Sequence, residues 1–486
     1  MDVEERRLNE LVQRVVQRVR EEMALPVRGE AELPSPPGSI RDGGQQDGVF
    51  ATVDQAVAAA KAAQRALAAL PLAGRERLLA AMRTAAEDNA ESLARAAQQE
   101  TGLGRWADKR EKNLLAARKT PGTEDLPTQA RSGDHGLTLT EFAPYGVIGA
   151  ITPVTNPTST IICNAIGMLA AGNAVVFNAH PGAKEVSAET VRLLNRSIVA
   201  AGGPPNLLTV LQVPTIETAQ ELMRHPGIRL LVVTGGPGVV KVAMNSGKKA
   251  ICAGPGNPPV VVDETADLEQ AARDIVNGAS FDNNLVCVLE KEIIVVDAVA
   301  DALKAALAAC GGFELQSWEM ARLDKVIFQE VRPAPEESVI NKALVGRDAA
   351  VILREIGKRV GDEVRLAFAE VPRGHPLVWT EQLMPVLPLV RVASASEAID
   401  LAIAAEGGRG HTAVMHSKHL DHLSRMAREI NTSIFVKNGP ATAGLGMNGE
   451  GYASFSIASP TGEGLTSAKH FSRVRRCTLV DSFRIV

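Results

Sequence analysis

The sequence contains few aromatic residues and few cysteines. Phe, Trp and Tyr together make up 3% of the 486 residues, and the five cysteines lie far apart without a CxxC pair. This pattern argues against a disulfide framework or a thiolate metal site, so we expect no metal and a reducing compartment. No apolar run reaches about 18 residues, the length of a membrane span, and the N-terminus is charged where a secretory signal needs an apolar core. We therefore expect a cytoplasmic protein that is neither exported nor membrane-spanning.

The sequence also lacks a strong excess of charge of either sign. Its formal net charge is -4, and its contents of 45% apolar and 22% charged residues are ordinary for a globular protein. Neither nucleic acid nor an acidic membrane is an expected partner, because both attract strongly basic surfaces. Small-molecule chemistry is the default expectation, and the length allows two or three domains.

The N-terminal region divides into a helical pattern and a linker. Residues 1–24 combine an apolar stripe with a polar face, and residues 25–50 are rich in Pro and Gly, which disfavour both helix and strand. Such a helix on a flexible tether favours docking onto another protein, although folding back onto its own body explains the pattern equally well. The stripe consists of Leu8, Leu11, Val12, Val15, Val16, Val19 and Met23.

The globular body is expected to begin near Thr52, whose spacing to Gln55 is that of a capping box before an alanine-rich helix through Leu70. A second long helix is expected from about Gly74 to Glu100. From Tyr145 onward, short β-rich runs alternate with helical segments, which predicts a doubly wound α/β fold with a parallel sheet. The β-rich runs are YGVIGAIT, AVVFN, LLTVLQ and RLLVVT.

Ligands of doubly wound sheets bind at the carboxyl ends of the strands. The loops expected there are 152–157, 178–184, 234–238 and 253–259. The third carries TGGPG, whose glycines would let backbone amides approach a pyrophosphate. Because its spacing is not GxGxxG, a tight structural turn explains it about as well.

One cysteine stands out in the stretch GASFDNNLVCVLEKEIIVV. Cys287 lies between a polar turn and the strand-like run Ile293–Val296, a position suited to a nucleophile that is carried into a rigid element. The alternative is a buried and inert thiol, since cysteine is among the most buried residue types. After Cys287 the α/β alternation resumes through about Val436, which predicts a second lobe.

The C-terminal segment KHFSRVRRCTLVDSFRIV alternates as a strand does, and the run Leu137–Phe142 is a potential pairing partner. Edge strands of this kind are also available to a neighbouring subunit. The predicted organisation consists of a first α/β domain at residues 51–262, a second α/β domain at residues 263–460 and a C-terminal strand at residues 461–486, with residues 132–144 contributing to the same group of strands.

Three segments, taken in order, resemble the aldehyde dehydrogenase superfamily and its acylating, coenzyme A-dependent branch. TPVTNPTST resembles the segment that carries the oxyanion asparagine, which would be Asn156. FDNNLVCVLEKEIIVV resembles the nucleophile segment, with Cys287 as the nucleophile. EQLMPVLP resembles the segment whose glutamate, here Glu381, helps to hold the nicotinamide ribose. The resemblance spans about residues 50–486.

This resemblance implies a Rossmann-like cofactor domain, a second α/β catalytic domain and a small β flap that joins subunits into a dimer or tetramer. The likeness is greatest to propionaldehyde dehydrogenases of propanediol-utilising bacterial microcompartments, although acetaldehyde and other short aldehydes remain open. Residues 1–24 then resemble an encapsulation peptide that binds a shell protein, which would place the enzyme inside a microcompartment in the cytoplasm.

The resemblance also implies binding of NAD, but it leaves NADP open. Many relatives place a lysine after the strand that follows GN, whereas this sequence has Asn178 there. The residues expected to bind the cofactor are Thr152, Pro153, His180, Pro181, Gly182, Thr234, Gly235, Gly236 and Glu381.

The expected acceptor of the acyl group follows from a missing carboxylate. Hydrolysing relatives carry a water-activating glutamate in a motif resembling ELGGKSP, but residues 245–262 contain no Asp or Glu here. Water is then a poor acceptor, and transfer to coenzyme A is expected. His375 is a candidate for assisting the thiol or contacting coenzyme A. The competing hypotheses are a hydrolytic dehydrogenase, an acyl phosphate reductase and a non-catalytic scaffold.

Overall fold

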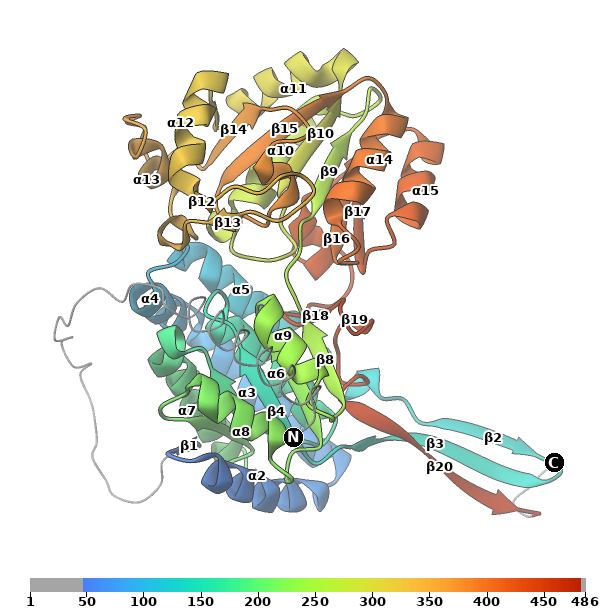
Figure 1. The fold of residues 1–486 in the computed structure, drawn as a ribbon. Helices are drawn as coiled ribbons and strands as arrows, with labels where there is room; N and C mark the ends of the chain where they lie inside the picture. The colour runs from blue at the N-terminus through green and yellow to red at the C-terminus, as the bar shows by residue number, and fades with distance from the viewer. Residues whose placement is uncertain (1–46, 482–486) are drawn as a thin grey trace, which may run out of the picture.

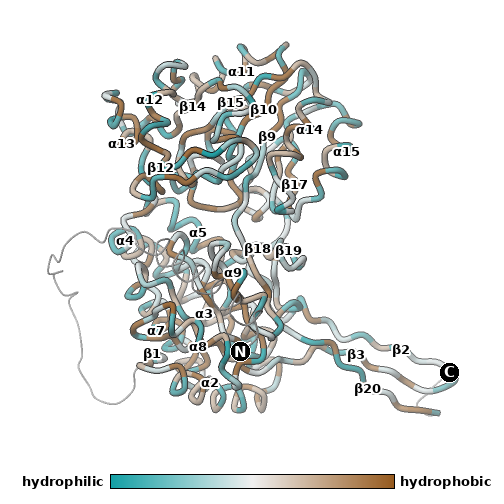
Figure 2. The backbone as a smooth tube through the Cα atoms, in the orientation of Figure 1, coloured by the Kyte–Doolittle hydropathy of each residue, from teal (hydrophilic) through white to brown (hydrophobic). Residues whose placement is uncertain are grey.

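The computed structural model describes residues 47–481, which form two α/β lobes and a projecting three-stranded arm (Figure 1). The expected helix at residues 1–24 and most of the expected linker at residues 25–50 lie outside the described residues. The hydrophobic segments of the backbone concentrate within the two lobes, as Figure 2 shows.

A six-stranded parallel sheet forms the centre of the first lobe. From β4 the chain moves outward through two strands on one side and then through two strands on the other. The reversal beside β4 is a topological switch point, where doubly wound sheets bind ligands. In spatial order the strands are β1 (Val49–Phe50), β6 (Leu208–Leu211), β5 (Ala174–Ala179), β4 (Val147–Thr152), β7 (Leu230–Thr234) and β8 (Ala250–Ala253).

The start of this lobe differs slightly from the expectation. Strand β1 falls within the last residues of the expected linker and pairs with β6, so regular structure begins at Val49. The Thr52 side chain caps the first helix and accepts a hydrogen bond from the Gln55 N–H at 3.3 Å, which confirms the predicted helix start.

The expected long helix from Gly74 to Glu100 is wrong, because the structure contains two helices there. They meet at Asn89, which has φ -107° and ψ 11° and whose side-chain Nδ2 donates to the Ala85 carbonyl at 2.9 Å. An asparagine that bonds the local backbone competes with helix continuation. The helices of this lobe are α2 (Val53–Ala68), α3 (Leu72–Asp88), α4 (Ala90–Thr101), α5 (Trp106–Lys119), α6 (Pro157–Ala170), α7 (Lys184–Ala200), α8 (Ile216–Arg224) and α9 (Pro237–Met244).

The second lobe is built on a seven-stranded parallel sheet. In spatial order its strands are β11 (Gly312–Glu314), β14 (Leu366–Glu370), β15 (Val386–Val392), β10 (Glu292–Val296), β9 (Pro259–Val262), β16 (Thr412–His416) and β17 (Ile434–Lys437). Strand β9 lies between β10 and β16, so the chain leaves the first sheet after Ala253 and enters the second at Pro259. The sheet boundary therefore falls before the predicted division at Val262.

The helices of the second lobe flank this sheet. They are α10 (Leu268–Ser280), α11 (Asp297–Ala309), α12 (Ser317–Ile327), α13 (Ala349–Arg354), α14 (Ala395–Glu406) and α15 (Leu420–Glu429). After β17 the chain returns to the first lobe through β18 (Ile457–Ala458), which contacts β8, and β19 (Gly464–Leu465). Ala468 and Phe471 then pack into the core of the first lobe. The expected catalytic and C-terminal segments thus both contribute residues to the first lobe.

The arm consists of β2 (Gln129–Gly133), β3 (Gly136–Pro144) and β20 (Ser472–Val480), paired antiparallel. The pairing of β20 with β3 confirms the predicted pairing of the terminal segment. A Cβ at Gly136, where φ is +110°, would lie 1.9 Å from the Leu479 carbonyl oxygen, so only glycine fits this register.

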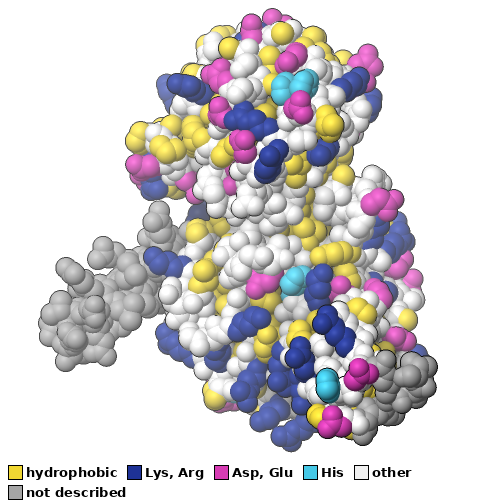
Figure 3. All heavy atoms as spheres, turned by 90° about the vertical axis from the view of Figure 1, so that its right-hand side faces the viewer, with side chains coloured by type: hydrophobic (Ala, Val, Ile, Leu, Met, Phe, Trp, Pro, Cys, Tyr) yellow, Lys and Arg dark blue, Asp and Glu magenta, His cyan; other side chains and the backbone are white. Residues whose placement is uncertain are grey.

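The arm projects away from the two lobes (Figure 1), and β20 is exposed from Arg473 to Val480. The face of the molecule on this side carries many Lys and Arg side chains over its lower part (Figure 3). Strand β20 contributes Arg473, Arg475 and Arg476 together with the exposed apolar residues Val474 and Val480.

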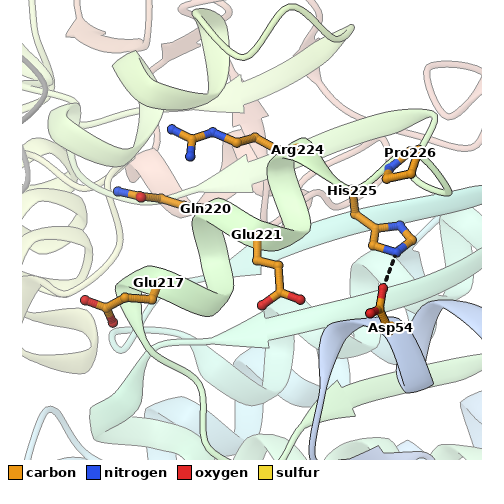
Figure 4. Close-up of a pocket in the computed structure, with 7 residues that line it drawn as sticks. All are labelled: Asp54, Glu217, Gln220, Glu221, Arg224, His225 and Pro226. Carbon is orange, nitrogen blue, oxygen red and sulfur yellow. Dashed lines mark hydrogen bonds and ion pairs between the residues drawn. The ribbon is translucent and has the colours of Figure 1, made fainter. Parts of the chain in front are cut away.

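A hollow of about 490 Å³ lies beside α8 in the first lobe (Figure 4). His225 Nε2 and Asp54 Oδ1 lie 2.8 Å apart at one side of it. The hollow contains none of the predicted site residues and is lined by Asp54, Glu217, Gln220, Glu221, Arg224, His225 and Pro226. Within residues 47–481, no helix has the length and apolar character needed to cross a membrane.

Candidate active site

Cys287 lies on the loop between the short helix η3 (Phe281–Asn284) and strand β10. Its neighbours Val286 and Val288 are buried, whereas Cys287 retains partial exposure. A reactive thiol must be reachable by its substrate, and a fully buried thiol is inert. The position of Cys287 therefore favours the nucleophile interpretation over the buried, inert one.

The loop before Cys287 has an unusual backbone. Asp282, Asn283 and Asn284 have φ values of 46°, 55° and 67°, in the left-handed region. Such residues cost about 1 to 3 kcal/mol each and persist only where the surrounding structure fixes them. Here Asn284 Nδ2 donates to the carbonyls of Ala279 at 2.8 Å and Glu290 at 3.0 Å. The loop that presents the thiol is thus held by its own buried side chains.

Burial raises the pKa of the Cys287 thiol to about 12, and the Glu381 carboxylate raises it further, while the Lys291 ammonium opposes both effects. Burial also raises the pKa of Glu381 to about 7. Glu381 Oε1 accepts a hydrogen bond from the Gly256 N–H at 3.3 Å. In this state the thiol is protonated at neutral pH, so its attack on a carbonyl must be coupled to loss of the proton.

Asn156 approaches the nucleophile loop from the other lobe. It is the N-cap residue of α6, and its Nδ2 lies 3.1 Å from Thr155 Oγ1 and 3.5 Å from the Leu285 carbonyl oxygen. Leu285 lies two residues before Cys287 in the chain. The structure therefore brings Asn156 to the Cys287 loop, as a donor for a developing oxyanion requires.

The other predicted cofactor residues lie at the carboxyl ends of β4, β5 and β7, beside the switch point. The His180 N–H donates to the Thr152 carbonyl at 3.1 Å, which joins two of these strand ends. The buried Thr152 Oγ1 has no hydrogen-bond partner among the described residues, so it is available to a ligand. The grouped residues are Thr152, Pro153, His180, Pro181, Gly182, Thr234, Gly235 and Gly236.

Two of these side chains are engaged within the protein. His180 Nδ1 accepts from the Gly182 N–H at 3.0 Å, and burial lowers the pKa of His180 to about 4, so the ring is neutral at pH 7. Thr234 Oγ1 lies 2.7 Å from Ser456 Oγ. Gly236 is the N-cap residue of α9, where free backbone N–H groups favour an anion such as a pyrophosphate. The switch-point edge therefore fits a dinucleotide.

Asn178, at the place where many relatives carry a lysine, is buried within the protein. Its Oδ1 accepts from Thr218 Oγ1 at 2.7 Å, and its Nδ2 lies 3.5 Å from the Thr215 carbonyl oxygen. These bonds tie β5 to the N-terminus of α8. They also mean that Asn178 supplies no cation for a ribose phosphate.

The segment at residues 245–262, which lacks carboxylates, runs directly behind the nucleophile. A Cβ at Gly256 would lie 2.6 Å from the Cys287 carbonyl oxygen and 2.9 Å from Cγ of His411. The Cys287 carbonyl and the His411 ring therefore both pack against the same side of Gly256, which leaves no room for a side chain there. Two carboxylates from later in the chain reach this loop, since Glu381 Oε1 accepts from the Gly256 N–H and Glu292 Oε1 accepts from Asn257 Nδ2, each at 3.3 Å.

His375 has both ring nitrogens engaged. Its Nε2 lies 3.0 Å from Asp324 Oδ2, and its Nδ1 accepts from the Leu377 N–H. His411 is different, because its buried Nε2 has no partner within the described part of the chain, while its Nδ1 lies 2.9 Å from Thr412 Oγ1. Burial lowers the pKa of His411 to about 3, so the ring is neutral. His411 therefore has a ring nitrogen that is open to a ligand, whereas His375 has none.

A buried ionic cluster that the sequence does not reveal lies next to Asn156. Lys109 and Lys112 of α5 both bond to the Asp282 carboxylate, and each of the three side chains is at most 2% exposed. The stretch WADKREKN contains alternating charges, which normally indicate a solvated helix face. The three-residue spacing of the two lysines places them on one face, but the sequence gives no sign that this face is buried.

The two α/β lobes and the switch point of the first sheet match the architecture of a dinucleotide-dependent oxidoreductase. The family model "Aldehyde dehydrogenase family" matches residues 43–311, and the chain belongs to this family. The predicted resemblance and the predicted α/β fold class are thereby confirmed.

Among curated proteins, the chain is 53% identical to the acetylating acetaldehyde dehydrogenase EutE of Salmonella typhimurium, over 90% of this chain and 94% of that protein. It is 47% identical to the CoA-propanoylating propanal dehydrogenase of Citrobacter freundii, with the same two coverages. The relatives thus include enzymes named for a two-carbon and for a three-carbon aldehyde.

Solved structures agree with this assignment. The Rhodopseudomonas palustris propionaldehyde dehydrogenase with bound CoA and an acylated cysteine is 51% identical, with a TM-score of 0.86 over 90% of this chain and 98% of that chain. An engineered glycolyl-CoA reductase with bound NADP+ is 50% identical, with a TM-score of 0.87 over 90% and 99%. A propionaldehyde dehydrogenase from the fucose utilisation microcompartment of Clostridium phytofermentans is 45% identical, with a TM-score of 0.87 over 90% and 100%.

Proposed function

We propose that the protein is a CoA-acylating aldehyde dehydrogenase that converts a short-chain aldehyde, NAD and coenzyme A into acyl-CoA and NADH. The observation that carries this proposal is the contact of Asn156 with the loop that bears Cys287, beside the switch point of the first sheet. The absence of a carboxylate from residues 245–262 favours a thiol over water as the acceptor.

In the first step, Cys287 Sγ forms a bond to the carbonyl carbon of the aldehyde, and the proton of the partly exposed thiol passes to water. Negative charge develops on the former carbonyl oxygen, where Asn156 Nδ2 and the Cys287 backbone N–H donate hydrogen bonds. Thr152 and its neighbours at the strand ends, together with Glu381 at the ribose, would hold NAD, which would supply the hydride acceptor. Cys287 then carries the acyl group as a thioester.

In the second step, the thiol of coenzyme A attacks the thioester carbon, and Cys287 Sγ leaves and recovers a proton. We assign the acid–base role to His411. Its ring is neutral at pH 7, and in the tautomer whose Nδ1–H faces Thr412, Nε2 has a free lone pair. The exchange of one thioester for another is nearly neutral in energy, whereas activation of water requires a general base.

The product formed with and without coenzyme A tests this proposal. Without coenzyme A, we expect one turnover of NADH per active site and no sustained formation of free acid. Addition of coenzyme A should restore steady turnover, with acyl-CoA and NADH formed in equal amounts. Free acid at full rate without coenzyme A would indicate a hydrolytic enzyme, and dependence on inorganic phosphate would indicate acyl phosphate chemistry. Matched assays with C2 to C4 aldehydes and with NAD or NADP determine which aldehyde and which dinucleotide the enzyme prefers.

Propionaldehyde is the proposed substrate, as the sequence resemblance implies. Acetaldehyde is the second candidate, because the acetylating relative is more similar in sequence to this chain than the propanoylating one. For the dinucleotide we propose NAD. The buried Asn178 supplies no positive charge at the place where a lysine would meet a ribose phosphate. Lys184 is the next basic residue along this loop, and its Nζ lies 3.8 Å from the Glu185 carboxylate, which offsets its charge.

The arm supports a homo-oligomer, either a dimer or a tetramer. Strand β20 exposes one edge of the three-stranded sheet and the apolar residues Val474, Leu479 and Val480. An unpaired strand edge with exposed apolar side chains is suited to contact with a second copy of the chain.

We further propose that the enzyme resides in a bacterial microcompartment within the cytoplasm and that residues 1–24 bind a shell protein. The support is the apolar stripe of these residues and the microcompartment origin of one structural neighbour. Fused to a fluorescent reporter, residues 1–24 should cause the reporter to co-purify with compartment shells. A fusion in which Leu11 and Val15 are changed to Glu provides the matched control. Equal recovery of the two fusions would contradict the proposal.

A further inference from the structure

The buried ionic cluster at α5 joins the two lobes beside the candidate oxyanion donor. Lys109 Nζ lies 3.0 Å from Asp282 Oδ2, and Lys112 Nζ bonds to the same oxygen. Buried charges are costly unless they are paired and hydrogen-bonded, so an arrangement with two ammonium groups on one carboxylate requires a reason. Asp282 belongs to the nucleophile loop, whereas both lysines belong to the cofactor lobe.

The two lysines differ in their remaining contacts. Lys112 Nζ donates to Asn156 Oδ1 at 2.5 Å, whereas Lys109 Nζ donates to the main-chain carbonyl of Thr155 at 3.1 Å. A carboxamide is planar, so a bond that fixes its oxygen also fixes the direction of its N–H groups. Asn156 Nδ2 consequently donates to Thr155 Oγ1 at 3.1 Å and points towards the Leu285 carbonyl at 3.5 Å, and the second, longer contact is readily exchanged for a substrate oxygen.

We propose that Lys112 is a positioning residue that orients and polarises the Asn156 carboxamide for stabilisation of the oxyanion. This inference rests on the proposed role of Asn156 in the aldehyde dehydrogenase reaction. A hydrogen bond from an ammonium group to the amide oxygen withdraws electron density, which makes the amide N–H a stronger donor. The effect is greatest when the oxyanion carries its full charge, so it lowers the barrier more than it tightens substrate binding.

The charged groups around Lys112 affect how much of its side chain is in the ammonium form. Asp282 faces Lys112, the second ammonium comes from Lys109, and Asp108 is paired with Arg365 at 3.0 Å. Burial lowers the pKa of Lys112 to about 8, while Asp282 raises it. The ammonium form therefore predominates at pH 7 and is lost as the pH rises above about 8.

A double-mutant cycle between Lys112→Met and Asn156→Ala tests the proposal. The measured quantity is the rate of the single NADH turnover without coenzyme A at saturating NAD and aldehyde. In the wild-type background, Lys112→Met should slow this turnover about 10- to 100-fold with little change in the KM for aldehyde. In the Asn156→Ala background, the same change should cost less than about threefold, because its target is absent. Equal losses in both backgrounds would overturn the proposal.

Lys109→Met is the matched control, because Lys109 shares the ion pair with Asp282 but does not contact the Asn156 side chain. Its effect should be the same in both backgrounds. Lys112→Arg, which keeps a cation, should restore part of the rate, and this variant also serves if Lys112→Met does not fold. No recovery in a folded Lys112→Arg variant together with equal losses in both backgrounds assigns Lys112 a purely structural role. Full activity of Asn156→Ala alone would instead refute the oxyanion role of Asn156.

Discussion

Replacement of Cys287 with alanine is expected to lower steady-state NADH formation on the order of 10⁴-fold or more, because loss of the nucleophile removes the covalent route. The acyl-enzyme, visible by mass spectrometry after incubation with aldehyde and NAD, should disappear completely. The other cysteines are poor substitutes, since Cys163 and Cys252 are buried. The affinity for NAD should change little.

Cys310→Ala is the matched control, because Cys310 is an exposed thiol at the end of α11. This variant should retain wild-type turnover and a full acyl-enzyme signal. Unchanged NADH formation in Cys287→Ala would refute the nucleophile assignment. If the wild-type protein itself produced no NADH, the non-catalytic scaffold hypothesis would be favoured.

Alkylation of the wild-type protein, with Cys287→Ala and Cys310→Ala for comparison, tests the protonation state of the Cys287 thiol. Its pKa of about 12 leaves the thiol protonated at pH 7 in the absence of substrate. Alkylation of Cys287 by iodoacetamide should therefore accelerate continuously between pH 7 and 10, as the small thiolate fraction grows. A rate that levels off below pH 8 would show that the thiol ionises far more easily than its surroundings indicate.

The second large effect is expected for Asn156→Ala. Loss of one oxyanion donor costs about 3 to 4 kcal/mol of transition-state stabilisation, which corresponds to a rate about 10² to 10³ times lower. The loss should appear in the rate of the single NADH turnover, while the KM for aldehyde changes little. A raised KM at an unchanged rate would indicate that Asn156 binds the ground state and the transition state equally.

Asn178→Ala provides the comparison for Asn156→Ala. Both are asparagines at the ends of strands or helices in the first lobe, but Asn178 bonds to Thr215 and Thr218 of α8 and not to the nucleophile loop. Its replacement should lower the thermal unfolding midpoint by a few degrees and leave the chemical step nearly intact. A similar loss of rate in both variants would point to disturbance of the lobe as a whole.

The α/β alternation and the strand character of β3 and β20 were predictable because they depend on local periodicity. The division of strands between the two sheets was not. PVVV at residues 259–262 has the composition of any buried parallel strand, and only long-range pairing assigns β9 to the second sheet. The break at Asn89 was missed because a single side-chain hydrogen bond decides it.

Among the site residues, sequence resemblance indicated Cys287, Asn156 and Glu381, since each lies in a distinctive segment. It gave no means to choose between His375 and His411, because both lie among apolar residues and only their contacts distinguish them. The burial of Lys112 could not be predicted from the sequence, for a related reason. Whether a helical lysine is solvated or buried depends on a carboxylate 170 residues away in the chain.

The two chain segments that connect the lobes lie next to the thiol. The first passes Gly256 against the Cys287 carbonyl, and the second begins near Ala441, whose N–H donates to Glu290 Oε1 at 2.7 Å. Both segments are visible between the lobes in Figure 1. Both passages of the chain between the two sheets therefore contact the loop that carries the nucleophile. A substitution in either connecting segment is thus a change next to Cys287 as well as a change between the lobes.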